Sequence, residues 1–386
     1  MIMDYPIYLD NNATTPCDPQ VVEAMLPFFS EHFGNAASKT HTHGWFTEEA
    51  VAQAREQIAN LIGASVQEII FTSGATESIN LAIQGIAEKH STKGNHIITV
   101  STEHKAVLDV CEHLQSKGFE ITYLGVDATG MIDLEELKNS IRENTILIAA
   151  MFANNETGVL LPVAEMGAIA HARSVPFFCD ATQAVGKIPV DVIRDNIDMM
   201  AFSGHKMYGP KGVGALYVRK KDPMIEISPL FYGGGHERKL RSGTLNVPGI
   251  VGIGKAAELC KVLMQEESAI LQIYRDKLWN AVRDVSGVQW NGNPAQSLPH
   301  VANICFSIPG GDNLIKLLTK HMSVSSGSAC SSATVSPSHV LKAMGRSDIE
   351  ALSSIRFSFG RFTEEQETNK AIDEVRNAVL RSLKKA

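Results

Sequence analysis

Residues 68–85 read EIIFTSGATESINLAIQG, a short apolar run followed by a turn at Gly74 and a helical pattern. The pattern predicts a buried strand, a tight turn and a helix whose first residues are Ala75 and Thr76. Free N–H groups and the positive end of the helix dipole favour an anion such as a phosphate at this position. The same letters also make an ordinary helix N-terminus, so this stretch alone leaves both interpretations open.

Apolar runs and helical patterns alternate on both sides of this stretch. A helical pattern precedes it at 44–63, and apolar runs follow at 96–100, 119–124 and 145–152, with helical patterns between them. Short apolar runs separated by helices are typical of parallel strands covered on both faces. We therefore expect an α/β fold whose large domain, residues 16–260, contains a mixed, mainly parallel sheet.

The C-terminal third of the chain has a different pattern. A long periodic stretch from Pro248 to about Val285 predicts one helix or a pair of helices that lead into a second unit. Two short apolar runs, ANICFSI and SSIRFSF, follow it, with two helical patterns nearby. We expect a smaller α+β domain that comprises residues 1–15 and 261–386 and carries the Ser-rich segment 323–337.

The composition disfavours several classes of protein. A net charge of -7 without a basic block disfavours nucleic acid as a ligand. The longest apolar-rich run, TILIAAMFA, is too short to span a bilayer, and the N-terminus lacks the pattern of a secretory signal. Six cysteines without a C-x-x-C pair and 13 histidines without an H-E-x-x-H motif indicate reduced thiols and no metal site. We expect a cytoplasmic protein with neither nucleic-acid nor membrane partners.

Charged side chains follow two consecutive apolar runs. Asp180 ends the run VPFFCD, and Ser203, His205 and Lys206 follow the run IDMMAF. Because ligands bind at the carboxyl ends of strands in open α/β sheets, we expect these residues to share one crevice. A lysine that can lose its proton and an aspartate that keeps a pyridine nitrogen protonated are the pair that a pyridoxal phosphate enzyme requires. Taken singly, an aspartate in this position more often caps a turn, and a lysine such as Lys206 is more often a solvated loop residue.

Two further strand ends carry candidate side chains for such a cofactor. His104, in STEHKAVLD, is placed to stack on the pyridine ring, although a lone histidine at this position more often caps the next helix. Asn154 and Asn155, in MFANNETG, are both candidates to donate to the ring hydroxyl, although asparagine is common in turns. The choice between the two asparagines stays open.

The chain resembles the cysteine desulfurases of the class V aminotransferase family, in the group of housekeeping and nitrogen-fixation enzymes that feed iron–sulfur cluster assembly. The matching segments span nearly the whole chain: YLDNNATT, FTSGATES, TEHKAVLD, NNETG, DATQAVGK, SGHKMYGPKG, GGGHERKLRSGT, SSGSACSSA and SSIRFSFGRFT. The resemblance implies a fold-type I pyridoxal-phosphate-dependent transferase, with a large domain built on a seven-stranded, mainly parallel sheet.

The resemblance also implies roles for the cofactor-binding residues. Lys206 binds pyridoxal phosphate covalently, Asp180 pairs with the pyridinium nitrogen and His104 stacks on the ring. Gln183 and Asn155 contact the ring oxygen, and Asn155 also borders the substrate. The phosphate is held by residues of one subunit and by a threonine from the second subunit of a homodimer, namely Ala75, Thr76, Ser203, His205 and Thr244.

The remaining implied roles concern the substrate, L-cysteine. Arg356 clamps its carboxylate, a task that suits the bidentate guanidinium. Cys330 attacks its sulfur atom, which leaves L-alanine and a persulfide on the enzyme, with His104 a candidate to move the thiol proton. The Ser- and Gly-rich backbone around Cys330 predicts a mobile tether between the cofactor and a sulfur acceptor. The implied acceptors are an iron–sulfur scaffold or a relay protein for tRNA thiolation.

Two alternative functions stay open at this point. Another enzyme of the same fold, a class V aminotransferase or a selenocysteine lyase, would use the same cofactor residues, but transamination needs no thiol. A non-catalytic partner that has kept the fold is the second alternative, and the retention of Lys206, Asp180 and Cys330 argues against it.

Overall fold

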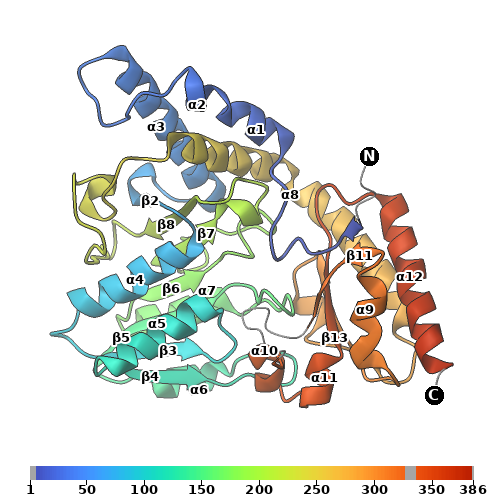
Figure 1. Cartoon of the computed structure of the whole chain (residues 1–386). Helices are drawn as coiled ribbons and strands as arrows, with labels where there is room; N and C mark the ends of the chain where they lie inside the picture. Colours follow the sequence, from blue (N-terminus) through green and yellow to red (C-terminus); the bar gives the residue numbers. More distant parts are fainter. Residues whose placement is uncertain (1–5, 327–335, 385–386) are drawn as a thin grey trace.

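The computed structural model of the chain describes residues 6–326 and 336–384 and contains a seven-stranded and a four-stranded sheet. Figure 1 shows the two sheets in separate units, with helix α8 (Val247–Val282) running from one to the other. The stretch after Pro248 is therefore one helix rather than a pair. No helix in the described part of the chain is long and apolar enough to cross a membrane.

The large sheet has the order β2-β8-β7-β6-β5-β3-β4. Strand β8 runs antiparallel to both of its neighbours, and the other neighbouring pairs are parallel. Every strand except β4 is buried along its whole length, as expected for a sheet covered on both faces. The predicted α/β class with a mainly parallel sheet is confirmed. The strands are β2 (Ile69–Thr72), β3 (His96–Val100), β4 (Glu120–Leu124), β5 (Thr145–Met151), β6 (Phe177–Asp180), β7 (Met199–Ser203) and β8 (Gly214–Val218).

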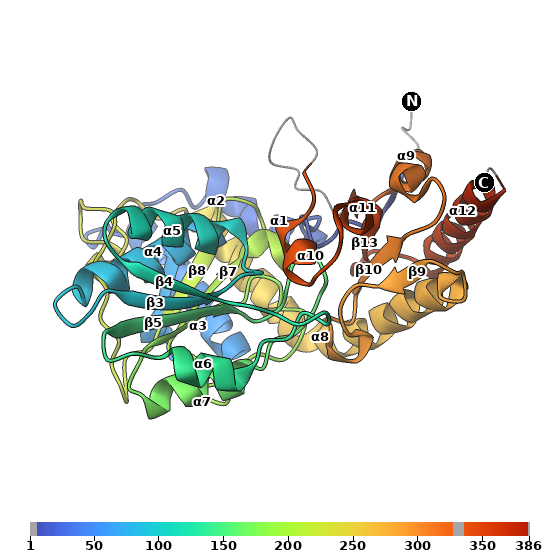
Figure 2. The ribbon, with the colours of Figure 1, turned by 90° about the horizontal axis from the view of Figure 1, so that it is seen from below.

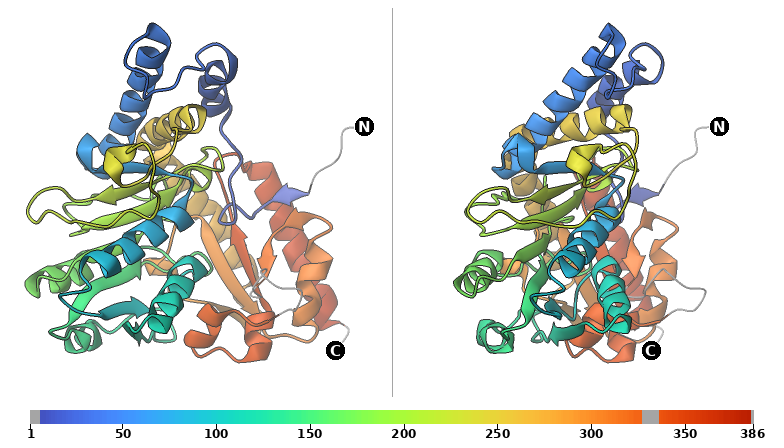
Figure 3. Two further views of the ribbon diagram at one scale, coloured as in Figure 1. Left: turned by 60° about the vertical axis from the view of Figure 1, so that its left-hand side comes forward. Right: turned by 90° about the vertical axis from the view of Figure 1, so that its left-hand side faces the viewer.

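Helices cover both faces of this sheet, and each face has its own apolar core. Helices α4 and α5 pack on one face, while α3, α6, α7 and the first half of α8 pack on the other. Figure 2 shows α5 and α7 on opposite sides of the strands, and Figure 3 shows the blue N-terminal helices beside the gold start of α8. The helices are α1 (Pro19–Met25), α2 (Pro27–Ser30), α3 (Thr42–Ile62), α4 (Ala75–Lys89), α5 (Lys105–Ser116), α6 (Leu134–Ser140) and α7 (Val163–Ala172).

The smaller unit is an antiparallel sheet of order β12-β13-β10-β9, packed against α12 and the second half of α8. Strand β1 (Ile7–Tyr8) pairs in parallel with β11 (Met322–Ser323), so the first described strand lies in this unit and the chain then crosses to the large sheet. The domain boundaries within α8 and near residue 15 stay a prediction. The other elements are β9 (Val288–Trp290), β10 (Val301–Phe306), α9 (Leu314–Leu318), β12 (Ser325–Ser326), α10 (His339–Ala343), α11 (Asp348–Leu352), β13 (Ser354–Ser358) and α12 (Glu365–Leu383).

A buried carboxylate fixes the long loop after β8 to the large sheet. Glu237 accepts two hydrogen bonds from Arg55 of α3, at 2.7 and 2.8 Å, and a third from the Phe71 N–H at 2.7 Å. The Glu237 side chain is only 2% exposed. Its backbone, like that of the next two residues, has a positive φ, which is unfavourable for residues other than glycine. The three hydrogen bonds therefore hold a strained turn in place.

Replacing Glu237 with alanine should lower the free energy of unfolding by about 3 kcal/mol or more, because it leaves the Arg55 charge without its buried partner. The midpoint of urea denaturation measures the loss. Glu48→Ala is the matched control, because Glu48 pairs with Lys39 on the surface and its removal should cost less than about 1 kcal/mol. Equal losses of unfolding free energy in the two variants would contradict the role of Glu237 as a buried partner that holds the turn.

Candidate active site

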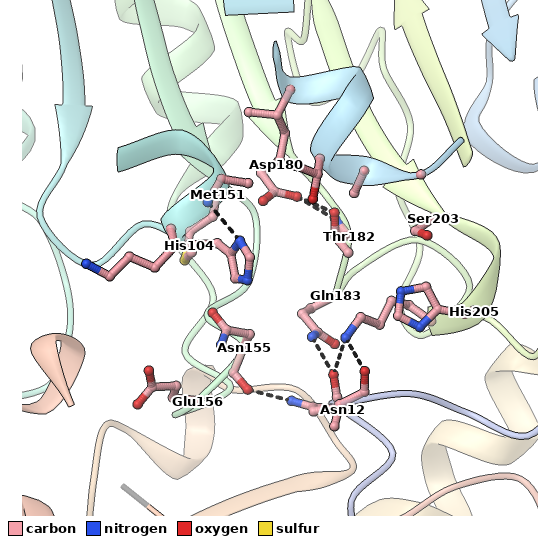
Figure 4. Close-up of a pocket in the computed structure, with 18 of the residues that line it drawn as sticks. Asn12, His104, Met151, Asn155, Glu156, Asp180, Thr182, Gln183, Ser203 and His205 are labelled. Atoms are coloured by element: carbon pink, nitrogen blue, oxygen red, sulfur yellow. Dashed lines mark hydrogen bonds between the residues drawn. The ribbon is translucent and has the colours of Figure 1, made fainter. Parts of the chain in front are cut away.

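A cavity of about 830 Å³ opens where the parallel strands of the large sheet end. Its lining includes Asp180 at the end of β6, Ser203 at the end of β7 and Arg356 from β13 of the small sheet. Figure 4 shows labelled side chains from several strand ends pointing into this space. Both sheets therefore contribute to one site.

The helix start predicted from residues 68–85 lies at one side of the cavity. Gly74 has φ 155° and ψ 179°, a conformation open essentially to glycine alone, and α4 begins directly after it. Gly214 of β8 is needed for close packing, because a Cβ there would lie 2.6 Å from the Gly74 Cα. Ala75 and Thr76 line the cavity, and no side chain among the described residues caps the helix start. These backbone N–H groups form a seat for an anion.

His205 and Ser203 extend this seat from the end of β7. Burial first, and then the charges of Lys206 and Lys211, lower the pKa of His205 to about 4. The imidazole is therefore neutral at neutral pH, and its Nδ1 lies 3.1 Å from the Thr14 hydroxyl. The two residues thus contribute hydrogen-bonding groups without adding a charge.

Lys206 and Asp180 reach the cavity from the neighbouring parallel strands β7 and β6. Burial first, and then the charge of Arg356, lower the pKa of Lys206 from 10.5 to about 8. An amine with so low a pKa loses its proton more easily, which nucleophilic attack on a carbonyl requires. Asp180 is only 5% exposed, and its Oδ1 accepts a hydrogen bond from the Thr182 N–H at 3.0 Å.

His104 lines the cavity and also caps the next helix, so both interpretations of this histidine describe its position. Its Nδ1 accepts a hydrogen bond from the Ala106 N–H at 3.1 Å. A ring nitrogen that accepts carries no proton, so in the neutral ring the proton is on Nε2. In the neutral ring, Nε2 therefore acts as a hydrogen-bond donor toward a group in the cavity.

The structure separates the two asparagines that the sequence left open. Asn154 uses its whole side chain within the turn, donating to the Thr102 carbonyl and accepting from the N–H groups of Glu156 and Thr157. Asn155 instead lines the cavity. Only Asn155 is therefore placed to contact a ligand.

Residues 10–14 cross the cavity and contact most of its walls. Lys206 Nζ donates to the carbonyls of Asn12 and Ala13, both at 2.6 Å, and Gln183 donates to the Asn12 carbonyl at 3.0 Å. The Asn12 amide donates to the Asn155 carbonyl at 3.0 Å (Figure 4). Sequence reasoning assigned no role to Asn12, and the only available signal was its place within the motif YLDNNATT.

Glu103 is a second residue that sequence reasoning missed. The side chain is fully buried, and its Oε1 accepts a hydrogen bond from the Met151 N–H at 2.6 Å. Burial, followed by repulsion from Asp180, raises the pKa of Glu103 well above its usual range. The raised pKa favours the neutral acid form of the Glu103 side chain.

Arg356 forms the wall of the cavity on the side of the small sheet, and the residue is 8% exposed. Its Nη1 donates to the Asn155 carbonyl at 2.8 Å, while Nη2 donates to Asp10 Oδ1 at 2.7 Å and to Ser325 Oγ at 2.9 Å. Its Nε is buried and has no hydrogen-bond partner among the described residues. A cation with unused N–H groups in a polar cavity is suited to bind a carboxylate.

Two of the expected site residues are not brought into this cavity. Thr244 is exposed and lies in a separate hollow with Tyr232 and His236, so the same chain does not deliver it to its own site. Cys330 lies outside the described residues. The chain on both sides of that gap borders the cavity, because Ser326 and His339 line it.

The cavity residues fit pyridoxal phosphate. The start of α4 offers a seat for the phosphate, Lys206 offers an amine with a lowered pKa, and Asp180 offers a buried carboxylate for the ring nitrogen. Within residues 6–326 and 336–384, no group of three or more His, Cys, Asp or Glu side chains is arranged to hold a metal ion.

Comparison with known proteins places the chain in one family. The family model described as aminotransferase class-V matches residues 7–370. The proteins named cysteine desulfurase IscS from Klebsiella pneumoniae and Salmonella typhi are each 52% identical over 381 residues, a match that covers 98% of this chain and 94% of theirs.

Solved structures agree with this assignment. One named NifS-like protein has a TM-score of 0.90 and 37% identity, with 97% of this chain and 99% of that one covered. A second, named SspA in complex with cysteine, has a TM-score of 0.81 and 38% identity, with 93% and 100% covered. The chain therefore belongs to the class-V aminotransferase family.

Proposed function

We propose that this chain is a pyridoxal-phosphate-dependent cysteine desulfurase, which converts L-cysteine to L-alanine and retains the sulfur atom as a persulfide on Cys330. The observation that carries the proposal is 52% identity over 98% of the chain to proteins named cysteine desulfurase. The solved relative named as a complex with cysteine supports the choice of substrate. The retained Cys330 favours this reaction over transamination, which needs no thiol.

In this proposal the cofactor is held by the residues that line one side of the cavity. Lys206 binds it covalently, Asp180 pairs with its ring nitrogen, and His104 lies against the ring. Gln183 and Asn155 contact its oxygen, while the phosphate is held by Ala75, Thr76, Ser203 and His205. When bound, pyridoxal phosphate supplies an electron sink for the substrate α-carbon.

The protein's own groups act on the substrate in two places. Arg356 binds its carboxylate, which fixes the orientation of the substrate in the cavity. The Cys330 thiolate attacks that sulfur, so that a new S–S bond forms as the C–S bond breaks. The α-amino acid leaves as L-alanine with the proton that the thiol gave up. His104, a donor at Nε2, is the candidate to give its proton to the carbon from which the sulfur leaves, and the thiol proton then replaces it on Nε2.

We propose further that the working unit is a homodimer in which Thr244 completes the phosphate site of the other subunit. Support comes from its position, exposed and outside the cavity of its own chain. The Thr244 loop is tied to the start of α4, because Arg241 donates to Glu77 at 2.8 Å. The N-terminal helices and the loop between them also expose large apolar side chains that a second subunit would cover: Leu26, Phe29, Phe33, Trp45 and Phe46.

The persulfide on Cys330 would pass to a sulfur-acceptor protein, either an iron–sulfur scaffold or a relay protein for tRNA thiolation. Of the five cysteines in the described part of the chain, all are free thiols. Free thiols are compatible with the reducing cytoplasm that we propose as the compartment.

Replacing Cys330 with alanine should abolish the release of sulfide from L-cysteine, while the protein still binds pyridoxal phosphate. The reason is that the cofactor residues are intact and only the sulfur acceptor is lost. Sulfide assay, alanine assay and mass spectrometry of the peptide that contains Cys330 measure the effect. Cys305→Ala is the control, because Cys305 is buried in the small sheet away from the cavity. Full activity of the Cys330 variant would refute the mechanism.

The rate at which Lys206 captures added pyridoxal phosphate should rise with pH and level off above about pH 8, the lowered pKa of this lysine. Only the neutral amine is nucleophilic, so the rate should increase about tenfold for each pH unit below that value. Borohydride trapping of cofactor-free protein, followed by mass spectrometry, measures the rate. A rate that keeps rising to pH 10, as for an ordinary lysine, would contradict the lowered pKa.

A further inference from the structure

Asp10 accepts a hydrogen bond from the Arg356 nitrogen that a substrate carboxylate would need for bidentate binding. Its Oδ1 accepts from Arg356 Nη2 at 2.7 Å and from the Ser325 hydroxyl at 2.8 Å, and Nη2 also donates to Ser325 Oγ at 2.9 Å. A guanidinium nitrogen such as Nη2 carries two protons, so both are in use. The cation is therefore already paired with a carboxylate of the same chain.

The geometry of the guanidinium means that the pairing with Asp10 affects how a second carboxylate can bind. A carboxylate binds it bidentately through two parallel N–H groups, either those of Nε and Nη2 or those of Nη1 and Nη2. Both modes need a proton of Nη2. An incoming carboxylate must therefore displace Asp10 or Ser325 from Arg356, or bind through a single hydrogen bond.

We propose that Asp10 is an internal competitor for the substrate-carboxylate site on Arg356. Asp10 lowers the affinity of the site for simple carboxylates, so that tight binding requires a ligand that is also held by its amino group at Lys206 and the cofactor. Asp10 is thus a specificity-determining residue that selects α-amino acids. This inference rests on the proposed role of Arg356 as the carboxylate clamp.

The surroundings of Asp10 are suited to such an exchange. Its backbone is fixed, because it forms a bridge with Ser358 of β13 and its carbonyl accepts from the Tyr8 hydroxyl at 3.1 Å. The side chain, in contrast, lines the cavity and is 20% exposed. Rotation of the side chain alone can therefore move the carboxylate from Arg356 toward water.

A second arginine on the same segment of chain forms a buried ion pair that can be compared with that of Arg356. Arg361 pairs with Asp18, and both side chains are nearly inaccessible, at 7% and 6% exposed. Neither residue lines the cavity. The pair of Arg356 and Asp10 differs because Asp10 is 20% exposed and both residues line the space where the ligand binds. An incoming carboxylate can therefore take the place of Asp10 without leaving the arginine charge unpaired.

The test is the binding of 3-mercaptopropionate, which is cysteine without its amino group, to the cofactor-loaded protein by calorimetry. Asp10→Asn keeps the size of the side chain and removes its charge, so the Kd of the probe should fall about fivefold. In the same Asp10→Asn variant KM for L-cysteine should also fall, and kcat should change by a smaller factor than KM. Ser325→Ala, which frees one Nη2 proton, should lower the probe Kd by a smaller factor.

Two controls accompany this measurement. The neutral amide 3-mercaptopropionamide should bind the Asp10 variant and the unchanged protein equally, because it does not compete for the cation. Asp133→Asn removes one charge from an exposed helix cap that does not line the cavity, and it should leave the probe Kd unchanged.

The outcomes separate this inference from the proposed function. A probe Kd that stays the same or rises in both Asp10→Asn and Ser325→Ala would overturn the competitor role and leave Asp10 as a support for Arg356. Arg356→Lys should weaken probe binding in any case, because lysine cannot bind a carboxylate bidentately. If Arg356→Lys leaves the probe Kd unchanged, the proposed carboxylate clamp itself is wrong.

Discussion

The parallel pairing of β6 with β7 is the constraint on which the site depends. Both strands run in the same direction within a buried sheet, so their carboxyl ends finish at one edge. Asp180 ends the first strand, and Lys206 follows the second within one turn. An acid and an amine that are 26 positions apart in the chain thereby share a cavity without any special loop. The burial of Lys206 at this edge lowers the pKa of its amine.

The N-terminal segment adds what the sheet cannot provide. It starts in the small unit beside β11, runs along β13 and then crosses the cavity to reach the end of β7. Along this path Asp10 meets Arg356, the carbonyls of Asn12 and Ala13 meet Lys206, and Thr14 meets His205. One short stretch therefore connects the cofactor side of the cavity with its substrate side. A substitution in this stretch can alter the contacts of both sides.

The charges around the cavity are arranged so that few remain uncompensated. Glu103 is kept neutral by burial beside Asp180, and His205 is kept neutral by burial beside Lys206. Arg356 carries its charge next to Asp10. Burying an unpaired charge costs free energy. In this site the hydrogen-bond donors that would bind a phosphate and a carboxylate are in place, while the charges among them are neutralised or paired before a ligand binds.

The sequence by itself determined the class of fold and predicted that Asp180 and Lys206 share one crevice. Apolar runs of four to seven residues that alternate with helical patterns indicate strands of a sheet covered on both faces, and Asp180 and Lys206 lie at or just after the ends of two such runs. Resemblance extended the assignment to Arg356 and Thr244, whose roles stay predictions. The tertiary structure placed Asn155 rather than Asn154 at the cavity, as the resemblance implied, and it alone revealed Asn12 and Glu103 and placed Asp10 against Arg356. The physical reason is that these placements depend on hydrogen bonds and charges that join segments from 48 to 346 residues apart, and no local pattern in the chain encodes such a meeting.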